Sequence, residues 1–312
     1  MNVVITGAAG FLGRILRARL PEDWNGTLTL VDVAADVDGS AADAAWLTGA
    51  MADRTRLAAA LRAADVVIGL AAVPGGAAER DYLASKSVNL DLPLAILDIL
   101  AERATPARYV HASTIAVFGA PLPPSVDDAT LPRPAMTYGA HKLMVETALA
   151  NFARLGRVDG IAVRLPALLA RPAGDNTMRS AFMSDLFHAC AAGRPFIVPT
   201  SESATVWAMS ASCGADNLLH AARIAPPDAA TSRAFTLPAL RVTMGELAGA
   251  VVRRTRCDPA LVTFERDDEL EAQFGRLPPL ATPLANGLGF AHDGSLDRMV
   301  GRALADAGYR GD

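Results

Sequence analysis

Residues 1–13 read Met1-Asn2-Val3-Val4-Ile5-Thr6-Gly7-Ala8-Ala9-Gly10-Phe11-Leu12-Gly13, an apolar run that leads directly into a Gly-x-x-Gly-x-x-Gly motif. A second apolar run, residues 27–31, ends at Asp32, nineteen residues beyond Gly13. This pattern predicts a strand, a tight glycine turn and a helix over residues 11–20 whose first amides face a pyrophosphate. The Asp32 carboxylate would accept hydrogen bonds from an adenosine ribose and repel a 2′-phosphate, so we expect NAD rather than NADP.

The first half of the chain alternates short apolar runs with helical patterns. We expect strands over 2–6, 27–32, 64–71, 108–113 and 160–165, and helices over 11–20, 54–63, 88–104 and 138–155. This order predicts an α/β fold, a Rossmann-type doubly wound parallel sheet with helices on both faces. Five prolines between residues 119 and 135 predict a loop, because proline suits neither a helix interior nor a central strand.

After residue 165 the alternation becomes irregular, with a helical stretch near residues 180–192. We therefore expect an NAD-binding Rossmann domain over residues 1–170, leaving open that later segments return to it. A smaller substrate-binding lobe is expected over residues 171–312.

Composition limits the partners and the compartment. The formal net charge is −4 and no basic run is present, which gives nucleic-acid binding no electrostatic support. No apolar run approaches the roughly 20 residues of a membrane-spanning helix, and the N-terminal apolar residues are assigned to the first strand rather than to a signal peptide. Three isolated cysteines and five dispersed histidines form no metal-binding spacing, so we expect a cytoplasmic protein without a metal.

Tyr138 and Lys142 lie at i and i+4 on one face of a predicted helix. A free tyrosine has a pKa of about 10, so a tyrosine that acts as a base near neutral pH needs its phenolate stabilised by about 4 kcal/mol. Lys142 and a positive nicotinamide ring are natural sources of that stabilisation. The pair follows, after one loop, the strand that ends near Ser113 and Thr114.

These residues together resemble the extended short-chain dehydrogenase/reductase family. The glycine motif of residues 6–13, Asp32, Leu70-Ala71-Ala72, Asn89, Ser113-Thr114 before Phe118-Gly119, and the Tyr138/Lys142 pair occur in that family's order. The resemblance implies Tyr138 as proton acceptor, Lys142 on the nicotinamide ribose, Thr114 as the hydroxyl that holds the substrate oxygen, and Ser113 as its second partner. The implied cofactor-binding residues are Thr6, Gly7, Gly10, Phe11, Leu12, Gly13, Asp32, Met51, Leu70, Ala71, Ala72, Asn89, Tyr138, Lys142 and Pro166.

One departure concerns adenine. The family often carries Gly-Asp-Leu after the third strand, with the aspartate on the adenine amino group, whereas this chain reads Gly49-Ala50-Met51. Ala50 cannot accept that hydrogen bond. Adenine would then be held by packing on Met51, by backbone groups, or by Asp53.

The substrate is indicated by the later part of the chain. The run of residues 164–172 lacks the Asn of sugar-nucleotide epimerases and, with residues 113–123 and 207–210, is similar to the D-erythronate dehydrogenase branch. That branch uses NAD to oxidise the C2 hydroxyl of four-carbon sugar acids. Arginine matches a carboxylate best, which makes Arg171 and Arg179 candidates, each with the alternative of a surface role. Trp207 is either a pocket wall, which we prefer, or core, and Thr205 and Ser212 stand where the branch has arginines.

The predicted function is NAD-dependent oxidation of a small sugar acid such as D-erythronate, with Tyr138 as the base. The alternatives are a sugar-nucleotide epimerase that keeps its NAD bound, and an NAD-binding regulatory module without turnover. The resemblance also implies a homodimer through the helices over residues 88–104 and 138–155. Apolar stripes allow this pairing, although they could instead only cover the sheet; they comprise Leu90, Leu94, Leu97 and Ala101, and Met144, Ala148 and Phe152.

Overall fold

A computed structural model describes residues 1–35, 44–49, 54–173, 179–225 and 233–309. The chain forms two compact units, each built from three segments. The first unit consists of Met1–Val117, Pro134–Arg164 and Ala215–Thr236, and the second of Phe118–Arg133, Leu165–Gly214 and Leu237–Asp312. The second segment of the first unit ends at Arg164, the proline-rich stretch belongs to the second unit, and a late segment, Ala215–Thr236, returns to the first.

The first unit is organised around a seven-stranded sheet in the order β10-β6-β5-β4-β1-β2-β3. Every strand pair whose register is described in this sheet is parallel. This is the Rossmann-type α/β architecture that the sequence predicted. The strands are β1 (Val3–Thr6), β2 (Leu28–Asp32), β3 (Ala45–Thr48), β4 (Val66–Gly69), β5 (Arg108–Thr114), β6 (Asp159–Leu165) and β10 (Ala234–Thr236).

Strand order reverses beside β1, because β2 lies on one side of it and β4 on the other. Val3 is in register with both Leu28 and Val66. All four residues of β1 are buried, as expected for a central strand covered on both faces. In such sheets ligands bind at the carboxyl ends of the strands near this reversal, which directs attention to the loops after β1 and β4.

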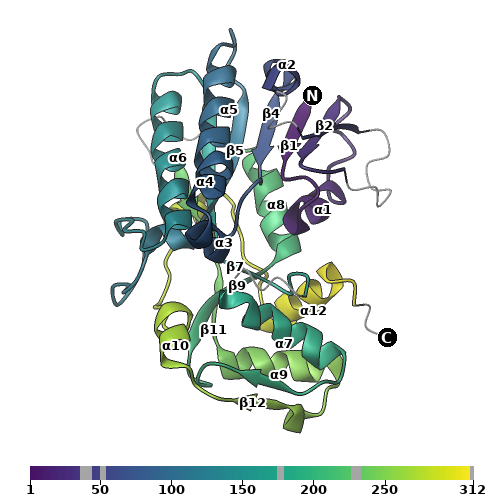
Figure 1. The fold of residues 1–312 in the computed structure, drawn as a ribbon, viewed down its shortest axis with the longest axis vertical. Coiled ribbons are helices and arrows are strands. Elements are labelled where there is room, and N and C mark those ends of the chain that lie inside the picture. Colours follow the sequence, from purple (N-terminus) through teal and green to yellow (C-terminus); the bar gives the residue numbers. More distant parts are fainter. Residues whose placement is uncertain (36–43, 50–53, 174–178, 226–232, 310–312) are drawn as a thin grey trace. The chain divides into compact units, whose positions relative to one another are not determined.

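Helix α5 packs with both α2 and α6, and the three helices share one buried apolar cluster with the sheet, while α1 and α8 lie at the other side of the sheet (Figure 1). Leu61, Leu97 and Leu149 are fully buried in this cluster. The helices of the first unit are α1 (Phe11–Arg17), α2 (Arg54–Ala63), α3 (Gly75–Arg80), α4 (Tyr82–Ser85), the π-helical turn Lys86–Asp91, α5 (Leu92–Ala101) and α6 (Thr137–Arg154); α8 (Ala211–Ala221) begins in the second unit and ends in the first.

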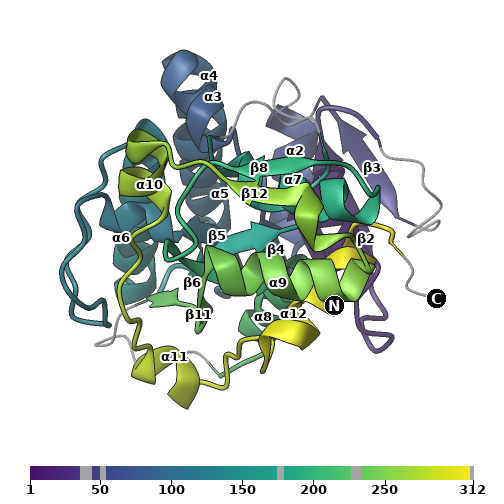
Figure 2. The ribbon, with the colours of Figure 1, turned by 90° about the horizontal axis from the view of Figure 1, so that it is seen from below.

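The second unit contains a three-stranded sheet in the order β11-β9-β7 and a two-stranded sheet of β12 and β8. Helix α9 packs against both α7 and α12 (Figure 2), around a core that includes Phe187, Val251 and Val300. The elements are β7 (Ala167–Leu169), α7 (Phe182–Ala191), β8 (Phe196–Val198), β9 (Thr205–Ser210), β11 (Leu240–Thr243), α9 (Met244–Thr255), β12 (Val262–Phe264), α10 (Asp268–Phe274), α11 (Pro283–Gly287) and α12 (Leu296–Asp306).

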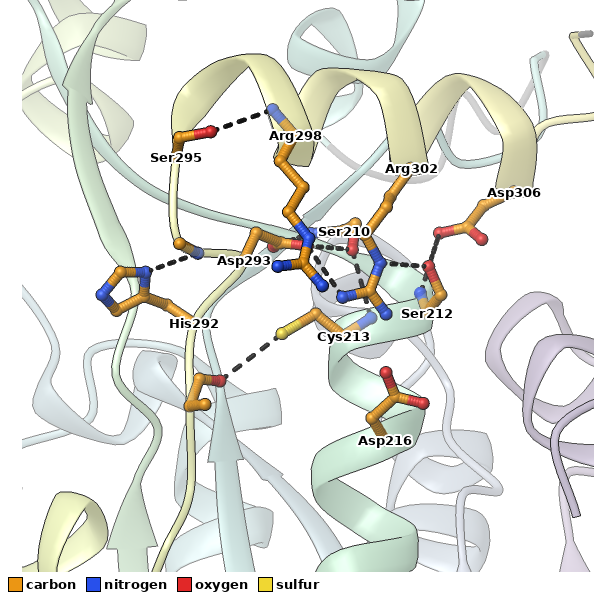
Figure 3. Close-up of polar contacts among 12 residues, drawn as sticks. Ser210, Ser212, Cys213, Asp216, His292, Asp293, Ser295, Arg298, Arg302 and Asp306 are labelled. Carbon is orange, nitrogen blue, oxygen red and sulfur yellow. Dashed lines mark hydrogen bonds and ion pairs between the residues drawn. The ribbon is translucent and has the colours of Figure 1, made fainter. Parts of the chain in front are cut away.

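A buried carboxylate ties α12 to the end of β9 (Figure 3). Asp293 accepts hydrogen bonds from the backbone amide and the hydroxyl of Ser210, at 2.9 and 2.6 Å. Arg302 of α12 lies 3.4 Å from the same carboxylate, so this buried charge is paired. None of the helices described is long and apolar enough to cross a membrane.

Candidate active site

The glycine motif forms a turn that only glycines could make. Gly7 has a φ of 72°, and a Cβ atom there would lie 2.5 Å from the amide nitrogen of Ala71, in the loop after β4. A Cβ atom on Gly13 would lie 2.3 Å from the carbonyl oxygen of Gly7. Helix α1 therefore starts in direct contact with the turn, and Gly10 before it has no side chain that could occupy the first amides. Those amides suit a phosphate group.

Asp32 ends β2 beside this turn. One carboxylate oxygen accepts a hydrogen bond from the amide of Ala9 at 2.8 Å, and the other accepts from the amide of Val33 at 2.7 Å. The two bonds hold the negative charge against the glycine turn, where the sequence predicted the ribose to lie. A carboxylate in this position fits NAD and repels the 2′-phosphate of NADP.

The loop after β4 forms the second wall. Leu70 donates its amide to the carbonyl of Thr6 at 3.0 Å, which keeps the Leu70-Ala71-Ala72 segment against the turn. Asn89 is fully buried, and its side-chain amide donates to the carbonyl of Val73 and accepts from the amide of Val73, at 2.9 and 2.8 Å. Asn89, which the sequence analysis placed at the cofactor, thus acts through the backbone of this loop.

Tyr138 lies in the first turn of α6, and the neighbouring Gly139 explains why the helix can come so close to β5. A Cβ atom on Gly139 would lie 2.4 Å from the carbonyl oxygen of Ala116, in the turn Ile115–Phe118 that follows β5. Any side chain there would push the helix away. The Tyr-Gly-x-x-Lys sequence is therefore what lets α6 present Tyr138 next to the end of β5, where Thr114 lies.

Lys142 is 1% exposed, although it carries a charge. Its ammonium group donates to the carbonyl of Ala112 at 2.8 Å and lies 5.8 Å from the centre of the Tyr138 ring. Burial lowers the pKa of Lys142 to about 8, and the nearby Glu146 carboxylate opposes that shift. The lysine is thus a cation at neutral pH, placed to stabilise a tyrosine phenolate.

The two hydroxyls at the end of β5 point to opposite faces, as successive strand residues do. Thr114 is partly exposed, and its hydroxyl oxygen accepts from the amide of Ala116 at 3.1 Å, which leaves the hydroxyl hydrogen to be donated. Ser113 is buried and donates to Glu146 at 2.5 Å. In this structure the Ser113 hydrogen is given to a carboxylate inside the protein, and a contact of Ser113 with the substrate oxygen stays a prediction.

Glu146 is a site residue that the sequence analysis missed. It lies four residues after Lys142 on the same face of α6, is buried, and forms an ion pair with Arg164 of β6 at 2.7 Å. Together with the Ser113 bond, this pair joins β5, α6 and β6 beneath the reactive groups. The signal in the sequence was the spacing: an acid at i+4 from a buried lysine belongs on the same helical stripe.

His111 is buried within β5, close to Lys142. Its Nδ1 atom lies 3.1 Å from the Tyr109 hydroxyl. Burial lowers the pKa of His111 well below its ordinary value, and the charge of Lys142 lowers it further. The imidazole is therefore neutral, so it adds no positive charge to compete with Lys142.

Four other predicted residues lie in the second unit. Pro166 joins β6 to β7, and the backbone carbonyl of Arg171 accepts a hydrogen bond from His188. The Arg179 side chain pairs with Glu269 at 2.5 Å, and both side chains are exposed. Trp207 is 1% exposed and donates its indole N–H to the carbonyl of Pro278 at 2.8 Å. This environment corrects our preference for a pocket wall, because Trp207 is a core residue of its unit.

The two positions where the related branch carries arginine are also occupied by internal contacts. Thr205 donates its hydroxyl to the carbonyl of Leu277 at 2.8 Å. Ser212 donates to Asp306 and accepts from Arg302 (Figure 3). An open depression of about 430 Å³ beside Thr205 is lined by Arg241 and Arg276, two arginines that the sequence analysis did not consider.

Met51, Ala50 and Asp53, considered for adenine, lie outside the described residues. Within the described parts of the chain, no group of three or more His, Cys, Asp or Glu side chains is arranged to hold a metal ion. The arrangement that remains is a dinucleotide cradle at the reversal point of the sheet and a Thr–Tyr–Lys set at the end of β5.

The family model described as the NAD dependent epimerase/dehydratase family matches residues 3–209. A D-erythronate dehydrogenase from Cupriavidus necator is 33% identical to the chain over 99% of both sequences. A second D-erythronate dehydrogenase, from Haemophilus influenzae, is 28% identical over 96% of this chain and 98% of the relative. Among solved structures, a nucleoside-diphosphate-sugar epimerase from Agrobacterium tumefaciens superposes with a TM-score of 0.86, with 28% identity over 98% of this chain and 94% of that one.

Proposed function

The chain belongs to the NAD dependent epimerase/dehydratase family, and from this premise we propose that it oxidises the C2 hydroxyl of a small sugar acid such as D-erythronate to the 2-oxo acid. It is an oxidoreductase with NAD as its cofactor. The choice of substrate rests on the two D-erythronate dehydrogenases, whose similarity extends over nearly the whole chain.

One observation carries the reaction type: the buried ammonium group of Lys142 beside the ring of Tyr138. A lysine without a function would lie on the helix surface and keep its hydration, whereas Lys142 is only 1% exposed. A positive charge at that place lowers the pKa of a nearby phenol, which is what proton abstraction from an alcohol requires. This argues against a module that only binds NAD, since binding needs no such base.

Each residue of the site has a separate role in the proposed reaction. The Thr114 hydroxyl donates a hydrogen bond to the C2 oxygen of the substrate and holds it near the phenol. Tyr138, as phenolate, takes the proton from that oxygen, and Lys142 stabilises the phenolate before the transfer. The glycine turn and Asp32 would hold NAD, which would accept the hydride that leaves C2. Asn89 and Glu146 act on this set only through the loop and the strand that they hold.

The substrate carboxylate requires a cation, and we propose Arg171 or Arg179 for it. The position of the Arg171 backbone is fixed. Its carbonyl accepts a hydrogen bond from His188, which also contacts Tyr309 at 3.0 Å. The preceding Ala170 has a φ of 55°, an uncommon conformation for a residue with a side chain. Arg179 would first have to leave Glu269, an exposed ion pair that is weak in water. These features favour Arg171.

The test is to follow NADH formation with four-carbon sugar acids and, in parallel, epimerisation of UDP-sugars. NADH produced from D-erythronate alone is the expected result. An epimer formed without release of NADH would replace the proposal by the sugar-nucleotide epimerase alternative, which shares Thr114, Tyr138 and Lys142. No turnover in either assay, with NAD bound, would leave the regulatory module.

We expect Tyr138→Phe to retain NAD binding and to lose nearly all turnover, at least a thousandfold. The ring still packs in the first turn of α6, but the proton acceptor is gone. NAD affinity measured by calorimetry and initial rates measured by NADH absorbance separate the two effects. A variant within threefold of the parent rate would remove Tyr138 from its assigned role.

We further propose a homodimer formed through α5 and α6, and a place in the cytoplasm. The dimer is supported by the exposed Met144 on α6, beside partly buried apolar residues of both helices. The cytoplasm is supported by Cys190, Cys213 and Cys257, which are free thiols.

A further inference from the structure

His141 is buried on α6, between Tyr138 and Lys142 in the sequence, and the roles proposed for those two residues do not require a histidine there. It is 2% exposed, one residue before Lys142 on α6. Its Nδ1 atom lies 3.0 Å from the hydroxyl oxygen of Ser85, at the end of α4. Ser85 is fully buried, so this contact joins two groups that have no access to water.

The hydrogen-bond directions can be deduced from the next contact. Asn89 donates to the same Ser85 oxygen at 3.0 Å, and it donates its other amide hydrogen to the carbonyl of Val73. Ser85 therefore receives a hydrogen bond and has its own hydrogen left to give, and His141 Nδ1 is the acceptor within reach. If Nδ1 carried a hydrogen, the buried Ser85 hydrogen would lose that acceptor. The satisfied arrangement is a neutral His141 with its proton on Nε2.

We propose that His141 and Ser85 are positioning residues that couple the catalytic helix α6, through Asn89 and Val73, to the loop that lines the NAD site. The connection runs from α6 to Ser85, to the π-helical turn that carries Asn89, and to the backbone of Val73 next to Leu70-Ala71-Ala72. A π-helical turn is rare and often marks a functional position. This inference rests on the proposed place of that loop at the cofactor.

The surroundings of His141 keep it neutral. Burial lowers the pKa of His141, the carboxylates of Asp91 and Glu79 oppose the shift, and Lys86 adds to it. Lys86 and Asp91 pair with each other at 2.6 Å, and the Tyr82 ring lies 5.4 Å from the imidazole. Lys142, the next residue on α6, adds a positive charge nearby. Protonation of His141 is therefore expected only on the acidic side of the ordinary histidine range.

A pair of variants at one position tests the acceptor. In His141→Asn the side-chain oxygen can occupy the place of Nδ1, so Ser85 keeps its acceptor. In His141→Leu the volume is retained and the acceptor is lost. The readout is the dissociation constant of NAD from calorimetry, which needs neither substrate nor turnover. We expect His141→Leu to weaken NAD binding about tenfold and His141→Asn to stay within threefold of the parent.

Ser85→Ala is a smaller change that should weaken NAD binding to the same extent as His141→Leu. The double variant Ser85→Ala/His141→Leu should bind NAD as tightly as either single variant, because all three break the same connection. The parent should also lose NAD affinity as the pH falls below the ordinary histidine range, whereas His141→Asn should not, since Lys86, Asp91 and Glu79 are present in both. Unchanged affinity in folded Ser85→Ala, or losses that multiply in the double variant, would overturn the proposal. A parent that fails to bind NAD would instead contradict the function proposed above.

Discussion

The ammonium group of Lys142 is removed from water and is held by the Ala112 carbonyl and the field of Glu146. Transfer of a charge into such a place costs free energy, which here appears as a pKa lowered from 10.5 to about 8. In the proposed mechanism the same charge stabilises the Tyr138 phenolate, which gives a functional reason for the cost. At the scale of a single residue, function and stability therefore oppose each other.

Lys142→Met should abolish turnover and raise the free energy of unfolding at pH 7 by about 1 to 3 kcal/mol, the upper value corresponding to the lowered pKa. The unfolded chain binds this proton more strongly than the folded one. The parent therefore gains stability as the pH rises from 8 toward 10.5, and the advantage of the variant should shrink across that window. Urea unfolding at pH 7 and pH 10 provides the measurement. A variant less stable than the parent at both pH values would show that the buried ammonium is net stabilising.

Asp32→Ala should relax the preference for NAD over NADP, because the charge that repels a 2′-phosphate is removed. The amide of Ala9 would also lose its acceptor, so affinity for NAD itself should fall several-fold. The ratio of kcat/KM for the two cofactors measures the first effect. Asp32→Asn, which keeps an oxygen acceptor without the charge, separates it from the second. Selectivity that stays at the parent value in both variants would place the carboxylate away from the ribose.

Several of these assignments followed from the sequence, because local spacing carried them. The glycine motif, Asp32 and the Tyr138/Lys142 pair are each defined within one turn or one strand. The hydrogen bond of Ser113 to Glu146 was not predicted, because it depends on the pairing phase of β5 and on the packing of α6 against it. Trp207 was ambiguous for the same reason, since a tryptophan suits a pocket wall and a core equally well until its indole partner is known.

At the scale of elements, long and strongly periodic segments were predicted well. The helix expected over residues 138–155 is α6 at Thr137–Arg154, and the strand expected over 108–113 is β5. Strand β3 was not singled out, because it has four residues and only partial burial, so its sequence shows little alternation. The helix expected over residues 88–104 is split into a π-helical turn and α5, a difference that depends on the tertiary bonds of Asn89.

Gly139→Ala tests how closely α6 must approach β5. The added Cβ atom would meet the Ala116 carbonyl at 2.4 Å, so the helix has to move, and Tyr138 moves with it. We expect turnover to fall tenfold or more and the free energy of unfolding to fall by about 1 to 3 kcal/mol. Gly287→Ala is the matched control, since Gly287 is also a helical glycine, in α11, and a Cβ atom there has nothing within 4 Å. Equal activity in the two variants would show that the close approach is dispensable.

At the scale of the whole molecule, the chain passes repeatedly between its two units, after Val117, Arg133, Arg164, Gly214 and Thr236. Strand β10, which pairs with β6 in the first unit, comes from a segment more than 60 residues later in the chain. Local patterns predicted that a Rossmann-type sheet would form, but they could not assign this last strand, because its three residues gain their place only from β6. No single cut separates the units, so activity has to be tested on the full chain.

Formation of a homodimer through α5 and α6 gives the last prediction. Leu97 of α5 is fully buried against the sheet, and Leu94 and Phe152 are partly buried. Met144 on α6 is 52% exposed. The stripes expected from the sequence therefore cover the sheet in part and leave Met144 exposed. Light scattering of the parent at micromolar concentration should report about twice the chain mass of 32.5 kDa.

Met144→Asp should shift the protein to the monomer, because it would place an unpaired charge in the interface. Ile197→Asp is the control, since Ile197 is similarly exposed, at 56%, but lies on β8 in the second unit. The control should remain dimeric and unfold at a temperature near that of the parent, since Ile197 is not buried in the chain itself. A parent that is monomeric and fully active, or a Met144→Asp variant that remains a dimer, would contradict an interface at α5 and α6.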